Sequence, residues 1–155
     1  MKASLVIGLG NPLMGDEGIG WHVIDQLSGN PRLPADTDLL WGGTDLLACA
    51  APMEGRRRII LVDALLDAAP VGSVTVWGNG EGLEDLADRQ AHAHHLSLTQ
   101  ALQLLPLASP SLGNVQFRLV AVSIHSVRMQ PQLSPALAAE MPHILNRVLQ
   151  ELAET

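Results

Sequence analysis

The stretch Val6–Gly20, VIGLGNPLMGDEGIG, carries the pattern that decides the fold. It continues a short apolar run that begins at Ser4, and such a run predicts a strand buried on both faces. The glycines that follow allow a sharp turn, and Asp16 is expected to cap a helix with apolar residues at helical spacing. Many proteins use a strand, a glycine turn and a helix to hold a phosphate. This loop instead carries two adjacent carboxylates, Asp16 and Glu17.

The rest of the chain alternates strand and helix patterns. We expect further strands at Asp38–Trp41, Ile59–Val62, Val71–Trp77 and Val115–Val122. We expect helices between Thr44, as a cap, and Pro52, from Ser97 to Leu105 with Pro106 ending it, and from Ser134 to the end of the chain. This alternation predicts an α/β fold, a three-layer, phosphorylase/hydrolase-like sandwich. Its mainly parallel, twisted sheet of about five strands would carry helices on both faces.

Length and composition limit the possible classes of protein. A chain of 155 residues predicts a single domain over residues 1–155. The formal net charge of −7 argues against nucleic acid and anionic membranes as partners. The basic run Arg56–Arg58 is expected to be a solvated strand entrance. Cys49 is the single cysteine, so neither a disulfide nor a thiolate metal cage is expected. We expect a cytoplasmic monomer.

Three groups of metal-ligand type are expected at the carboxyl edge of the sheet, where open parallel sheets bind ligands. Glu17 follows the first strand, Asp63 ends the third strand, and His92, His94 and His95 precede the helix that follows the edge strand. Two carboxylates and an imidazole suit zinc, nickel or another divalent ion, with positions left open. The residues alone leave a second interpretation open, in which Glu17 only favours a helix N-terminus and Asp63 only caps a strand end.

Two other interpretations of the loop fit less well. A dinucleotide fingerprint would need glycine where Leu13 stands, and the two carboxylates would repel a pyrophosphate. The segment VIGLGNP resembles the opening strand and turn of peptidyl-tRNA hydrolases, which would make the protein an esterase. Beyond Pro12, however, the segment with that family's catalytic histidine is missing, and His22 is the nearest imidazole.

A third resemblance extends along the whole chain. Five segments occur in the order and at the spacings of the nickel–iron hydrogenase maturation endopeptidases. They are GLGNPLMGDEGIG at Gly8–Gly20, GGT at Gly42–Thr44, IILVDA at Ile59–Ala64, HHLSL at His94–Leu98 and LVAVSI at Leu119–Ile124. Each segment is weak by itself, but together they are specific.

The resemblance implies a cytoplasmic endopeptidase. Such an enzyme removes a C-terminal extension from the precursor of a hydrogenase large subunit after nickel insertion. It implies that Glu17, Asp63 and His94 bind metal and take part in catalysis, with the nickel carried by the substrate and zinc or cadmium able to occupy the same site. This chain departs from the family pattern at Trp41, where relatives commonly carry an aspartate before GGT.

The mechanism and one rival function stay open at this stage. Glu17 or Asp63 can act as general base on a water, as in an aspartyl protease, or the metal can polarise the scissile carbonyl or activate the water. A non-enzymatic nickel-binding chaperone or scaffold for the large subunit would use the same three ligands. Ser123 and Ser126, beside His125, carry no mark of a nucleophile.

Overall fold

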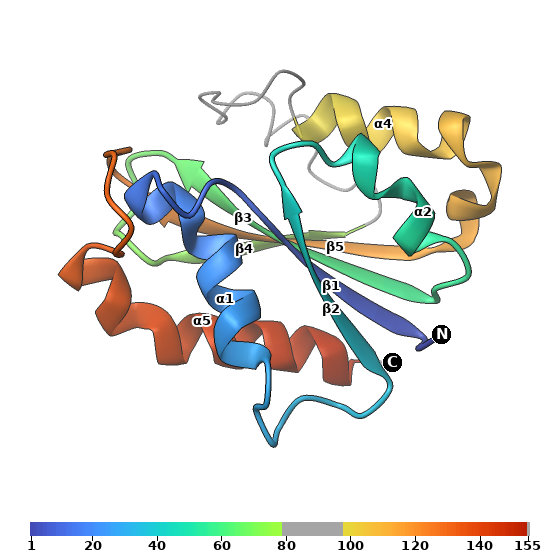
Figure 1. Cartoon of the computed structure of the whole chain (residues 1–155), viewed down its shortest axis with the longest axis horizontal. Helices are drawn as coiled ribbons and strands as arrows, with labels where there is room; N and C mark the ends of the chain where they lie inside the picture. Colours follow the sequence, from blue (N-terminus) through green and yellow to red (C-terminus); the bar gives the residue numbers. More distant parts are fainter. Residues whose placement is uncertain (79–97, 155) are drawn as a thin grey trace.

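The computed structural model describes residues 1–78 and 98–154, with the backbone alone at 98–100 and 108. Within these residues five strands form one sheet in the order β2-β1-β3-β5-β4 (Figure 1). The strands are β1 (Ser4–Leu9), β2 (Thr37–Gly43), β3 (Arg58–Leu66), β4 (Val74–Gly78) and β5 (Gln116–Ile124). All neighbouring strands are parallel except β4, which is an antiparallel edge strand beside β5. The predicted fold class is therefore confirmed.

Helices cover both faces of this sheet (Figure 1). One face carries α1 (Ile19–Leu27) and α5 (Pro135–Ala153), and the other carries α2 (Ala50–Met53) and α4 (Leu98–Ala108). Short 3-10 turns precede several elements: η1 (Gly15–Gly18) before α1, η2 (Leu47–Cys49) before α2 and η3 (Pro110–Asn114) before β5. A separate apolar cluster fills each face. In the described part of the chain, no helix has the length and apolar character needed to cross a membrane.

The third strand is longer than the sequence predicts. We expected Asp63 to terminate it, but β3 continues to Leu66, so that expectation was wrong. The physical reason is the pairing with β5, which continues through Leu66 and Ile124. The pairing of β3 with β1, in contrast, stops at Val62 and Gly8. Asp63 is thus the first residue of β3 beyond its pairing with β1, although it lies within the strand.

Two predicted helix boundaries also differ. Pro106 does not end α4, which runs to Ala108, because Ser109 N still donates to Leu105 O across the proline turn. Ser97, the predicted cap of α4, lies outside the described residues. Thr44 was the predicted cap of the helix before Pro52. The side chain that accepts a hydrogen bond from Leu47 N is instead that of Asp45.

Asp16 has a different role from the one predicted. It does not cap α1, whose N-terminus receives no side-chain hydrogen bond. Its two carboxylate oxygens instead accept from the backbone N–H and the hydroxyl of Ser134, both at 2.7 Å. Ser134 in turn caps α5 by accepting from Leu137 N. Asp16 therefore fixes the start of the C-terminal helix to the loop after β1.

The basic run fixes the other end of α5. The Arg58 guanidinium donates to the carbonyls of Glu151 and Leu152 at the end of α5 and to that of Glu154, the residue after the helix. Arg56 donates to Asp38, and this hydrogen bond holds the pKa of the Asp38 carboxyl below its usual value. Of the three arginines in this run, Arg57 is the one that is exposed. The expectation of a solvated run was wrong for Arg56 and Arg58, because sequence cannot show which carbonyls lie near a strand entrance.

Glycines bring the backbone of the loop and of α1 against β1. An ideal Cβ on Gly8 would lie 2.1 Å from Gly20 O, and one on Gly20 would lie 2.2 Å from Leu9 O. Gly10 has φ 108°, and its Cβ would lie 2.1 Å from Glu17 O. No other residue fits these positions without a backbone shift. The glycines thus determine where Glu17 lies.

Gly20→Ala is expected to lower the free energy of unfolding by at least about 2 kcal/mol, because the added methyl group meets backbone atoms that cannot rotate away. Urea unfolding followed by circular dichroism measures this. Gly113→Ala is the control, since nothing lies within 4 Å of a Cβ at Gly113. Equal losses in the two variants would contradict the role given to Gly20.

Ser134→Ala is expected to lower the free energy of unfolding by about 1–2 kcal/mol, because it removes a helix cap and one donor from buried Asp16. The matched control is Ser126→Ala, at an exposed position in the segment after β5. If both variants melted at the temperature of the wild type, Asp16 and Ser134 would not fix α5.

Candidate functional site

Glu17 lies in η1 and is buried, with 6% of its surface exposed. Its Oε2 accepts from the backbone N–H of Asn11 at 3.0 Å. Its Oε1 lies 3.7 Å from the position that a Cβ on Gly10 would take. The carboxylate therefore turns back toward the turn that leaves β1, at the carboxyl edge of the sheet.

Asp63 is more deeply buried, with 2% of its surface exposed. Its Oδ1 accepts from the backbone N–H of Ala64 at 2.8 Å. Leu61 and Leu65, two residues away on either side, belong to the apolar cluster beneath α2 and α4. Because side chains alternate along a strand, Asp63 points to the same face of the sheet.

The structure brings the elements that carry these two carboxylates into contact, since η1 packs against β3. Both side chains are buried at this edge. The third predicted ligand, His94, and its neighbours His92 and His95 lie outside the described residues. Among the residues that are described, no three His, Cys, Asp or Glu side chains form a group able to hold a metal. The three-ligand site therefore stays a prediction.

The burial of Glu17 and Asp63 at one edge of the sheet bears on what the site can bind. Burying a charged group is costly unless a partner compensates for the lost hydration. Carboxylate oxygens are good donors to divalent cations such as nickel and zinc. The donors of Glu17 and Asp63 therefore fit a metal ion, and either carboxylate can also accept a proton.

Trp41 stands directly before Gly42, at the position where the family pattern has an aspartate. The residue is 47% exposed, and its Nε1 donates to Gly10 O at 3.2 Å. On the other side of the turn, Gly10 N donates to Gly43 O at 2.8 Å. The indole is thus held beside the turn that leads to Glu17, and it supplies no acidic group there.

Ser123 is a polar residue of β5 that the sequence does not mark as a nucleophile. It is buried, and its Oγ has no hydrogen-bond partner among the described residues. It lies on β5 two residues beyond Ala121, the register partner of Asp63, and so faces the same side of the sheet. Alternation along the segment LVAVSI is the signal that would have found it. His125 is exposed, and its Nε2 lies 2.5 Å from Ala69 O.

His22, the nearest imidazole in the esterase interpretation, lies on α1. Its ring packs edge-on against Trp21, with centroids 5.1 Å apart. Its Nε2 is buried without a hydrogen-bond partner within the described residues. Burial lowers the pKa of His22, and the carboxylates of Asp25 and Asp16 oppose this shift. The neutral ring is therefore the favoured form.

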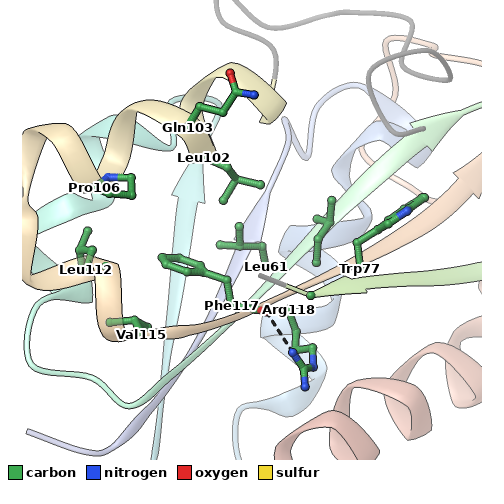
Figure 2. Close-up of a pocket in the computed structure, with 12 residues that line it drawn as sticks. Leu61, Trp77, Leu102, Gln103, Pro106, Leu112, Val115, Phe117 and Arg118 are labelled. Carbon is green, nitrogen blue, oxygen red and sulfur yellow. Dashed lines mark hydrogen bonds between the residues drawn. The ribbon is translucent and has the colours of Figure 1, made fainter. Parts of the chain in front are cut away.

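A separate apolar cavity of about 230 Å³ lies between α4 and the sheet (Figure 2). Its lining is mainly aliphatic and aromatic, including Leu61, Trp77, Leu102, Leu112 and Phe117. The one charged side chain of its described lining, Arg118, points away from it in Figure 2. Arg118 instead pairs with Glu151 on α5, with 3.6 Å between Nε and Oε2. The described lining of the cavity therefore lacks the groups needed for hydrolysis.

The comparisons with known proteins agree with this fold. The model of the hydrogenase maturation protease family, HycI, matches residues 21–151. The chain belongs to the hydrogenase maturation protease family. The matched range includes Asp63 and begins just after the loop that carries Glu17. The resemblance inferred from the sequence motifs is confirmed.

Individual family members are similar over nearly their full length. The hydrogenase 2 maturation protease of Escherichia coli K12 is 27% identical over 153 residues, which cover 97% of this chain and 91% of that protein. The structure of the hydrogenase maturating endopeptidase HybD from E. coli matches with a TM-score of 0.81 and 28% identity, covering 99% of this chain and 93% of that one. The NiFe hydrogenase maturation protease HybD from Thermococcus kodakarensis matches with a TM-score of 0.80 and 25% identity, covering 99% and 100%.

The lowered pKa of His22 predicts a stability that depends on pH. The neutral His22 ring stabilises the folded protein at pH values above 6.5, the ordinary pKa of histidine. This stabilisation is lost as the pH falls through the lower pKa that His22 has in the folded state. Between about pH 7.5 and about pH 5.5, the melting temperature is expected to fall more for the wild type than for His22→Gln, which cannot gain a proton. Differential scanning calorimetry measures both. Parallel decreases would show that His22 does not contribute.

Proposed function

We propose that this chain is an endopeptidase that removes a C-terminal extension from the large-subunit precursor of a nickel–iron hydrogenase, after nickel has been inserted. Membership of the maturation protease family supports the class of reaction and of substrate. The observation that carries the proposal is the pair of buried carboxylates, Glu17 and Asp63, on two elements in contact at the carboxyl edge of the sheet. We place the reaction in the cytoplasm.

The proposed metal-binding set is Glu17, Asp63 and His94. The topology supports the inclusion of His94, because α4 begins only four residues later, at Leu98, and covers the face to which Asp63 points. The thiol of Cys49 is not a suitable ligand. Burial raises the pKa of Cys49, so the thiolate needed for metal binding is disfavoured.

In this proposal the nickel arrives with the substrate. Three oxygen and nitrogen ligands leave positions open on the ion, and groups of the precursor that already hold the nickel can occupy them. Zinc or cadmium can take the same ligands. A metal ion held by Glu17, Asp63 and His94 would supply Lewis-acid chemistry at the scissile carbonyl or at the attacking water.

The protein's own groups orient the substrate and transfer the proton. Glu17 or Asp63 accepts the proton of the water that attacks the scissile bond. The backbone N–H groups of Asn11 and Ala64 hold the two carboxylates in fixed orientations. Cleavage would then require that the nickel-loaded precursor is in place, which makes the reaction a checkpoint on assembly.

The test is cleavage of the large-subunit precursor, prepared with and without nickel and followed by mass spectrometry. We expect the wild type to shorten only the nickel-loaded precursor. Glu17→Gln and Asp63→Asn keep the size of each side chain and are expected to slow cleavage by at least about 100-fold. Asp36→Asn is the control, since Asp36 is exposed and lies just before β2, at the opposite edge of the sheet.

Two outcomes would contradict parts of the proposal. Equal cleavage of nickel-free and nickel-loaded precursor would show that the nickel is not a gate. Tight binding of the loaded precursor without any cleavage would identify a chaperone or scaffold instead of an endopeptidase.

A further inference from the structure

Exposed apolar side chains border the Glu17 loop. They come from the turn after β1, the last part of β2 and the segment after β5, which lie at or beyond the carboxyl ends of parallel strands (Figure 1). This set, called the apolar rim here, consists of Leu13, Trp41, Val127 and Met129, with 63%, 47%, 39% and 86% of their surfaces exposed. The candidate site thus has apolar side chains on both of its flanks.

Hydrogen bonds connect one half of the apolar rim to Glu17. Asn11 N donates to the Glu17 carboxylate, and Leu13 N donates to Asn11 Oδ1 at 2.9 Å. Trp41 donates from its indole to Gly10 O, the residue just before Asn11. Leu13 and Trp41 are therefore held on the same turn that receives the carboxylate.

The other half of the apolar rim is held by the segment after β5. Gly15 N donates to Gln130 O at 2.8 Å, and Met14 forms a parallel bridge with Gln130. A Cβ on Gly15 would lie 3.1 Å from Arg128 O, which shows how closely the two segments pack. Met129, between these two contacts, is therefore held against the start of η1.

We propose that the apolar rim binds apolar residues of the substrate polypeptide on either side of the scissile bond, and that Trp41 is a specificity-determining residue. This inference rests on the proposed endopeptidase function. A tryptophan with a fixed ring and partial exposure is typical of binding hot spots. The chain has only three Trp, one Phe and no Tyr. The position of Trp41 beside the candidate site therefore favours a role in binding.

Geometry and charge favour this occupant. In the strand order β2-β1-β3-β5, Trp41 on β2 and Met129 after β5 lie on opposite sides of β1 and β3, the strands next to Glu17 and Asp63. A peptide that crosses this edge of the sheet would pass between Trp41 and Met129. An extended peptide advances about 3.3 Å per residue, so side chains on both sides of the bond can contact the apolar rim. The net charge of −7 disfavours acidic segments. The predicted recognition sequence is therefore uncharged or weakly basic, with apolar side chains near the cleavage point.

The experiment measures the affinity of nickel-loaded large-subunit precursor for the wild type and for variants by isothermal titration calorimetry, together with KM and kcat. Trp41→Ala and Met129→Ser are expected to weaken binding and raise KM by about fivefold or more, with little change in kcat. Trp41→Phe keeps an aromatic ring and is expected to restore most of the affinity. Leu107→Ser is the matched control, since Leu107 is 78% exposed but lies on α4.

Equal affinities of the Trp41, Met129 and Leu107 variants for the precursor would overturn the inference while leaving the proposed function intact. Because binding is measured separately, a wild type that binds but does not cleave would overturn the proposed function alone. Analytical ultracentrifugation tests another occupant of the rim. A wild-type dimer that Met129→Ser dissociates would show that the apolar rim binds a second copy of this chain, and would also overturn the inference.

Discussion

The structure depends on a direct backbone contact between β1 and the first turn of α1. Gly8 and Gly20 face each other so closely that a Cβ on either residue would overlap a carbonyl oxygen of the other segment. Gly10 extends the same contact to the backbone of Glu17. This contact brings η1 to the edge of the sheet and places a carboxylate there. The glycines of the loop therefore position a potential ligand, where a phosphate loop would leave room for an anion.

The same loop also holds distant parts of the chain. Asp16 fixes the cap of α5, and Gly15 holds the segment after β5 by a hydrogen bond to Gln130. Arg58 fixes the far end of α5 from the start of β3. The C-terminal helix is thus attached at one end to η1, which carries Glu17, and at the other end to β3, which carries Asp63. This gives the two carboxylates a rigid support, which a site with buried charges requires.

Sequence reasoning predicted much of the candidate site but not its surroundings. Parallel strands place their carboxyl ends together, so the positions of Glu17 and Asp63 at one edge could be inferred from the strand order. Their burial could not, because it depends on helices that pack from elsewhere in the chain. Trp41 was noted only as a departure from the family pattern. Its contact with Gly10 and its place in the apolar rim appear only when β2 is seen beside β1.

By itself the sequence determined the α/β fold class, the five-stranded sheet and the family, because apolar periodicity, glycine turns and the order of the motifs are local properties. Tertiary structure alone decided the role of Asp16, the length of β3 and the hydrogen-bond partners of Arg56 and Arg58. Asp16 finds its donors at Ser134, 118 positions away, and β3 is as long as its pairing with β5. A hydrogen bond to a distant residue leaves no periodic signal in the chain, so only the packed structure can identify the partner.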